Sequence, residues 1–440
     1  MGKKRFLFRR QQTGSNPYRV LFLLVLVLGS VFLLRGYGEG SVKPLHEPTP
    51  TPTRVPDSHA LEGEVHFHAG NLNSAIEAYR KALQQSPNNG HIWAELARIQ
   101  VYSSRLLTTD ALKKQRLQEA LESANMAVKT APEDSTASAV RAFVLDWNAN
   151  PALAGKDHDA LLTEAEQEAV RAINLDNQNA LALAYYAEIL IDQQKWVQAQ
   201  GYITQAVERD PSLMDVHRVY ALLMETLGRY PEAIQSYQRA IEINPNLTFL
   251  HLQVGILFRH LKQYEKALDY FAQAATINEQ LGVKDPMPYI AIAKTYAQTG
   301  DFFIASRNMR KALTFDPTSE DVYGQLGIIY FKSRNYEGAI PALRCAIYGC
   351  SAKESCEVRG CNESKDPPIE LKGMPLSGNT LVYYYTYGSV LAGMHRAGLD
   401  NCALALKTFD EVRKQYANDA TIMQIVQASE QICASFGVTR

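Results

Sequence analysis

Apolar and polar positions follow a helical period along most of the chain. In the stretch GRYPEAIQSYQRAIEINP, Gly228 to Pro245, Ala233, Tyr237 and Ala240 recur at steps of four and three residues. Such steps place side chains on one face of an α-helix. Proline has no backbone N–H and disfavours a helical conformation of the residue before it, so the pattern predicts an amphipathic helix that ends before Pro245.

The same spacing recurs in other parts of the chain. A small residue is followed twelve positions later by Ala, four further by a large apolar residue, three further by Ala and five further by Pro. Four registers fit fully and two fit with altered ends: Ala221, Ala233, Tyr237, Ala240, Pro245; Gly63, Ala75, Tyr79, Ala82, Pro87; Ala187, Ala199, Ile203, Ala206, Pro211; Ala293, Ala305, Met309, Ala312, Pro317; Gly255, Ala267, Phe271, Ala274; and Gly327, Ala339, Leu343, Ala346. A fixed period of this kind predicts a repeat architecture.

Three less regular copies complete the series. Residues 90–134 and 135–179 fit as copies with eleven extra residues each, and a degenerate copy starts near Asn379. We therefore expect nine units, each made of two short helices joined by a turn, with small residues where the helices approach closely.

This pattern resembles the tetratricopeptide repeat family over roughly residues 58–419. The resemblance implies an all-α superhelix of stacked helix-turn-helix repeats over 59–419, followed by a capping helix at 420–437. Insertions are expected near 101–111, 146–156, 280–285 and 347–378.

The N-terminal segment has a different pattern. Val20–Leu34 is apolar and uncharged, and extension to 19–37 gives a length that spans a hydrocarbon core of about 30 Å. We predict a transmembrane signal-anchor at 19–37, after a basic tail at 1–18 and before a Pro/Thr-rich linker at 38–58. A cleaved signal peptide is the alternative, although RGYGEGSV after Leu34 lacks a small-x-small alanine site.

Charge predicts the orientation of this segment. Six basic residues precede the apolar run and only Arg35 and Lys43 follow soon after it. Basic residues favour the cytoplasmic side, so we expect a cytoplasmic N-terminus and extracytoplasmic repeats in a single-pass membrane protein.

All six cysteines lie after residue 344, and an exported domain favours their oxidation. Cys402 and Cys433 are equidistant from the turn at 417–418, so an antiparallel hairpin would bring them within disulfide reach. The other four are Cys345, Cys350, Cys356 and Cys361. Two disulfides are the favoured state for these four, in any of three pairings; a zinc site or free thiols are the alternatives.

The chain lacks the sequence marks of an enzyme or a nucleic-acid-binding protein. Its net charge of −1 gives no basic footprint for nucleic acid. Motifs of nucleotide-binding sites, zinc proteases and α/β-hydrolases do not occur, and His66 and His68 are spaced so that they do not share a helix face. We predict no catalytic residue, cofactor or metal.

The resemblance implies a concave groove lined by the first helix of each repeat. We expect the strongest contacts with a protein or peptide partner from an aromatic anchor, aliphatic side chains and a basic rim: Phe249, Leu252, Ile256, Arg259, His260, Arg218 and Lys294. The wider projection adds Leu181, Glu188, Asp192, Asp215, Leu222, Glu225, Ile290, Gln298, Asp321, Ile328, Phe331 and Lys332.

These features suggest a non-enzymatic scaffold in a cell-envelope assembly. An accessory or regulatory subunit of an envelope enzyme, or an adaptor facing the cytosol, are the alternatives. The sequence leaves the partner and the oligomeric state open.

Overall fold

The computed structural model describes residues 14, 16–38, 56–362, 364–396 and 398–439. Most of the expected basic tail at 1–18 and of the linker at 38–58 lies outside the described residues. The chain divides into two compact units, Met1–Arg54 and Val55–Arg440.

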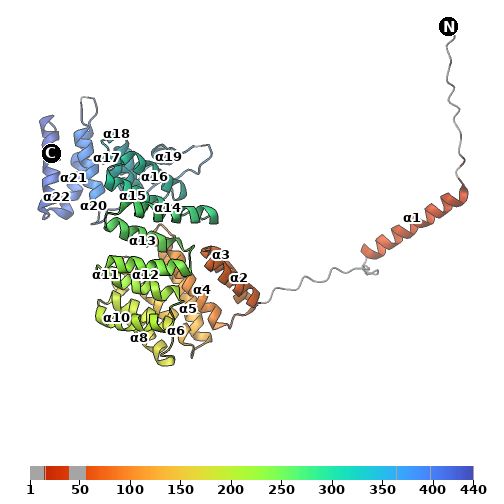
Figure 1. Ribbon diagram of the computed structural model, residues 1–440. Coiled ribbons are helices and arrows are strands. Elements are labelled where there is room, and N and C mark those ends of the chain that lie inside the picture. The colour runs from red at the N-terminus through yellow and green to blue at the C-terminus, as the bar shows by residue number, and fades with distance from the viewer. Residues whose placement is uncertain (1–13, 15, 39–55, 363, 397, 440) are drawn as a thin grey trace, which may run out of the picture. The chain divides into compact units, whose positions relative to one another are not determined.

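The first unit contains one described helix, α1 (Pro17–Gly38) (Figure 1). Its residues Pro17–Arg35 have a mean hydropathy of 2.2, and none of them is buried. At 1.5 Å per residue a helix of this length spans about 30 Å. By length and composition α1 suits a membrane span, and a signal sequence has the same properties.

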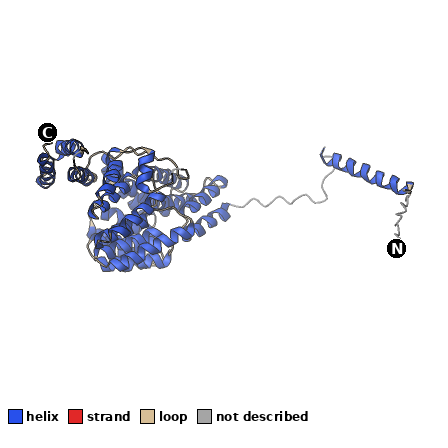
Figure 2. Cartoon of the chain, turned by 90° about the horizontal axis from the view of Figure 1, so that it is seen from above, coloured by secondary structure: helices blue, strands red, loops and turns tan. Residues whose placement is uncertain are grey.

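The second unit consists of helical hairpins, each packed on the next (Figures 1 and 2). Over 56–362, 364–396 and 398–439 the structure has nine hairpins, a C-terminal helix and no strand. The first five hairpins are α2 (Pro56–His68) with α3 (Leu72–Gln85), α4 (Gly90–Ser104) with α5 (Asp110–Thr130), α6 (Ser135–Asn148) with α8 (His158–Leu175), α9 (Ala180–Asp192) with α10 (Trp196–Arg209), and α11 (Met214–Thr226) with α12 (Tyr230–Ile243).

The remaining hairpins continue the series. They are α13 (Thr248–His260) with α14 (Tyr264–Leu281), α15 (Met287–Thr299) with α16 (Phe302–Phe315), α17 (Glu320–Lys332) with α18 (Tyr336–Tyr348), and α20 (Leu381–Gly393) with α21 (Asn401–Tyr416), followed by α22 (Ala420–Ser435). The expected all-α superhelix is therefore the fold.

The landmark spacing is a packing rule between the two helices of a hairpin. A Cβ built on Gly255 would lie 2.4 Å from the ring of Phe271, and one on Gly63 would lie 2.7 Å from the ring of Tyr79. The small landmark thus receives the large apolar side chain sixteen residues later. Where this landmark is alanine, as at Ala187, its side chain is fully buried.

The irregular copies keep the hairpin and lengthen parts of it. The extra residues of the second copy extend α5, and those of the third form the short helices α7 (Pro151–Ala154) and η1 (Gly155–Asp157). The segment after α18 contains α19 (Ala352–Arg359). Ser351 and Glu354 form a capping box at the start of this helix, in which the side chain of each accepts a hydrogen bond from the backbone N–H of the other.

The six cysteines form three pairs at disulfide distance. Cys402 on α21 pairs with Cys433 on α22, with Cα atoms 5.5 Å apart. The other pairs are sequence neighbours: Cys345 with Cys350, Cα 4.8 Å apart, and Cys356 with Cys361, Cα 5.0 Å apart. Of the three pairings that the sequence leaves open, the structure has this one.

Candidate partner-binding groove

The first superhelical turn closes on itself. Tyr102 at the end of α4 stacks on Phe249 of α13, with ring centroids 5.3 Å apart and an interplanar angle of 14°. Asn244, after α12, hydrogen-bonds to His68 at the end of α2, with the two nitrogens 2.9 Å apart. These contacts join segments more than a hundred residues apart, so the two ends of this turn pack against each other.

A buried ion cluster lies within the closed turn. Asp215, which is 1% exposed, accepts hydrogen bonds from Arg98 at 2.8 Å, from Tyr185 at 2.7 Å and from Tyr102. Burial alone would raise the pKa of Asp215, but Arg98, Arg218 and the two phenols lower it below its ordinary value. The carboxylate is therefore a charged structural centre.

A second ion pair lies beside this cluster. Arg218 donates two hydrogen bonds to Glu188, at 2.7 and 2.5 Å, and both side chains are buried. Trp147 donates its indole N–H to the same carboxylate at 3.2 Å. Arg218 and Phe249 were predicted on the partner groove, but the structure places both inside the closed turn.

An open groove of about 490 Å³ follows in the later repeats. Its lining comes from α13, α15, α16, α17 and α20: Arg259, Lys294, Ala297, Gln298, Met309, Asp321, Gln325, Ile328, Ile329, Lys332, Val382 and Tyr383. First helices of four repeats supply all of these residues except Met309. The groove therefore lies mainly on first helices.

The groove carries a net positive charge. Burial lowers the pKa of Lys294, and Arg259 lowers it further while Asp321 opposes this. Asp321 accepts a hydrogen bond from Tyr383 at 2.6 Å. Among the described residues, neither Lys294 nor Lys332 forms an ion pair. Two ammonium groups that form no ion pair among the described residues therefore line the groove together with Ile328 and Val382.

The predicted set divides between these places. Arg259 and Lys294 line the open groove, and the guanidinium of Arg259 also lies 5.7 Å from the ring centroid of Phe271. Leu252 and Ile256 are half-buried and pack against the core.

His260 is exposed, and its ring stacks on Tyr230 with centroids 6.0 Å apart. Sequence reasoning missed Val382 and Tyr383, because the insertion before α20 interrupts the register from which the groove positions were projected.

Metal ligation finds no support in the geometry. Within the part of the chain that the structure describes, no group of three or more His, Cys, Asp or Glu side chains is arranged to hold a metal ion. The four cysteines for which zinc was an alternative lie instead in two close pairs.

Comparisons with known proteins agree with the fold. The tetratricopeptide repeat profile matches residues 56–89, 187–247 and 250–281. No curated protein matches the chain in sequence.

Solved structures match in fold at low identity. The human IFIT1 dimer with m7Gppp-AAAA is 17% identical, with 86% of this chain and 81% of that chain covered and a TM-score of 0.52. A thermophilic repeat protein from Thermus thermophilus is 18% identical, with 46% of this chain and 99% of that chain covered and a TM-score of 0.38. The likeness to the IFIT1 structure bears on the fold alone. With the recurring hairpins and the landmark packing, the three profile matches show that the chain contains tetratricopeptide repeats.

Proposed function

We propose that this chain is a membrane-anchored scaffold that binds a protein or peptide partner in the open groove, on the extracytoplasmic side. Tetratricopeptide repeat proteins generally mediate protein–protein interactions. The observation that carries the proposal is the groove itself, in which neither Lys294 nor Lys332 forms an ion pair among the described residues and both share the lining with Ile328 and Val382.

The groove chemistry selects a class of partner segment. Exposed ammonium groups favour carboxylates, and the apolar floor favours one or two aliphatic or aromatic side chains. An extended segment or a helix with mixed acidic and apolar residues meets both demands. The scaffold acts by binding and performs no chemistry.

The proposed side of the membrane rests on charge and on the cysteines. The basic residues before α1 favour a cytoplasmic N-terminus. Three cysteine pairs at disulfide distance suit an oxidising compartment, where such bonds persist. Thiol labelling of intact cells, with and without prior reduction, tests this placement, since oxidised cysteines react only after reduction.

Charge reversal tests the groove. The full chain with Lys294→Glu and Lys332→Glu should lose its partner in quantitative co-purification after cross-linking in cells. A matched control reverses Lys284 and Arg307, two exposed cations that do not line the groove. Equal partner recovery by the groove variant and the control, with unchanged circular dichroism, would count against the groove as the binding surface.

A further inference from the structure

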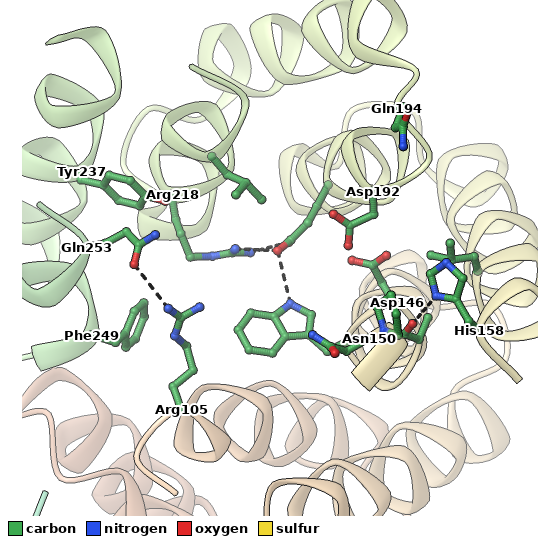
Figure 3. Close-up of a pocket in the computed structure, with 16 residues that line it drawn as sticks. Arg105, Asp146, Asn150, His158, Asp192, Gln194, Arg218, Tyr237, Phe249 and Gln253 are labelled. Carbon is green, nitrogen blue, oxygen red and sulfur yellow. Dashed lines mark hydrogen bonds and ion pairs between the residues drawn. The ribbon is translucent and has the colours of Figure 1, made fainter. Parts of the chain in front are cut away.

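The closed first turn encloses a cavity of about 550 Å³ that shares no lining residue with the open groove. Side chains reach it from α6, α8, α9, α11, α12 and α13 and from the residue after α4 (Figure 3). A volume of this size is typical of small-molecule sites, whose walls combine apolar surface with a few placed polar groups.

The two ends of the cavity carry opposite charge. Figure 3 shows Asp146 and Asp192 turned toward each other near His158, whereas Arg105 lies at the other end beside Phe249 and Gln253. Arg218, which pairs with Glu188, lies between the two ends in Figure 3.

At the acidic end, burial and the neighbouring carboxylates disfavour the charged forms of Asp146 and Asp192. Asp146 is only 3% exposed, and its Oδ1 atom has no hydrogen-bond partner. Burial, Asp192 and Glu188 all raise the pKa of Asp146, and Arg218 only partly opposes them because Glu188 engages its guanidinium. Burial and Glu188 likewise raise the pKa of Asp192 to about 6, which His158 and Arg218 oppose. A buried carboxylate without a partner is costly, so this end favours a cationic ligand.

The basic end holds a cation that faces the cavity. Arg105 is exposed, and its guanidinium lies 5.7 Å from the ring centroid of Trp147 and 5.8 Å from that of Phe249. Its one direct hydrogen bond in the cavity is to the Gln253 amide oxygen, at 3.4 Å. Among the described residues Arg105 forms no ion pair. The N–H donors of its guanidinium group are therefore available to bind an anion such as a carboxylate through two parallel hydrogen bonds.

We propose that this cavity binds a small zwitterion of the class of lysine and arginine. The side-chain ammonium or guanidinium group lies between Asp146 and Asp192, and the ligand carboxylate pairs with Arg105. The cation is organic, because no group of carboxylates and histidines among the described residues is arranged to hold a metal. The aliphatic stem of such a ligand matches the apolar walls that Leu162 and Leu222 add.

Isothermal titration of the detergent-solubilised full chain tests the proposal with four probes. L-lysine and L-arginine should bind. L-norleucine, which lacks the side-chain ammonium group, should bind about tenfold to a hundredfold more weakly than lysine, as for the loss of a hydrogen-bonded charge. Cadaverine, which keeps both amines and lacks the carboxylate, should fall between them.

Variants locate each end of the ligand. Asp146→Asn and Asp192→Asn should weaken lysine binding by a similar factor, whereas Glu208→Gln on the exposed face of α10 should leave it unchanged. Arg105→Gln should reduce lysine binding to the level of cadaverine and should not weaken cadaverine binding. Thermal melting controls for folding, since Asp146→Asn removes an unpartnered charge and should melt at or above the wild-type temperature.

Three results would overturn the proposal. They are equal binding of norleucine and lysine, unchanged lysine binding in folded Asp146→Asn and Asp192→Asn, or no binding of either lysine or arginine at millimolar concentration. Because Lys294 and Lys332 lie outside this cavity, the groove variants bear on partner binding alone.

Discussion

Gly255→Ala should destabilise the sixth hairpin although it improves the helix propensity of α13. The added Cβ would lie 2.4, 2.7 and 2.9 Å from three ring carbons of Phe271, far inside ordinary contact distance. Phe271 is fully buried and the Arg259 guanidinium lies near its ring, so the ring has little room to move. Overpacking of this kind costs about 3 kcal/mol at the upper end of its range. Replacement of glycine by alanine inside a helix returns about 1 kcal/mol, which leaves a net loss of about 2 kcal/mol.

Gly201→Ala is the matched control, because Gly201 lies inside α10 and nothing lies within 4 Å of its added Cβ. This change should stabilise α10 by about 0.5–1 kcal/mol. Repeats unfold partly independently, so the measurement is hydrogen exchange of α13 and α14 amides in one variant and of α10 amides in the other, supported by urea unfolding.

The double variant Gly255→Ala with Phe271→Leu should recover part of the loss, since the two sites share one contact. If Gly255→Ala slowed hydrogen exchange of the α13 and α14 amides to the same degree as Gly201→Ala slows exchange of the α10 amides, the packing rule between the helices of a hairpin would be refuted.

Three further predictions concern turns, pH and the cysteines. Lys262 and Arg334 have positive φ at the turn position where other repeats have glycine. Lys262→Gly and Arg334→Gly should therefore each raise the free energy of unfolding by about 0.5–1 kcal/mol, measured by urea unfolding. A loss of stability in these variants would contradict this prediction. The pKa of Asp192 is raised to about 6 in the fold, so its contribution to stability is full below the unfolded value near 4 and is lost as the pH rises through 6. Thermal melting from pH 4 to 7 should show this decline in stability. The Asp192→Asn variant, in which the facing residues Asp146, Glu188, His158 and Arg218 are unchanged, should show a smaller decline. An unchanged pH profile would show that Asp192 does not titrate in this range. Cys402→Ala with Cys433→Ala opens a loop of 31 residues and should cost about 3–4 kcal/mol, measured by hydrogen exchange of α21 and α22 under oxidising conditions. Identical exchange with and without reductant in the wild type would mean that the pair is not oxidised.

The hairpins can be predicted from the sequence because the two helices of each hairpin pack through residues that are close along the chain. Gly255 and Phe271 are sixteen residues apart, so the spacing of the residues that contact each other between the two helices can be recognised within one repeat. Interrupted copies remain recognisable for the same reason, since the extra residues only extend α5 or add α7 and η1.

The closure of the first superhelical turn cannot be predicted from the sequence in the same way. It depends on contacts such as Tyr102 with Phe249 and Arg98 with Asp215, which join residues more than a hundred positions apart. Small rotations between hairpins accumulate along the superhelix, and single-repeat spacing does not determine their sum. Arg218 therefore has the offset of a groove residue and yet lies in a buried ion pair, whereas Lys294, about one helical turn further along the first helix of a later repeat, lines the open groove.

Site-specific photo-cross-linking in cells tests the central claim most directly, that the open groove is the surface on which a protein partner lies. The cross-linker replaces Gln298 in the groove and, as a control, Val197, which is 88% exposed on α10. We predict a discrete cross-linked protein from Gln298 that disappears when Lys294 and Lys332 are reversed to glutamate, and none from Val197. The same partner cross-linked from Val197 and not from Gln298 would contradict the account.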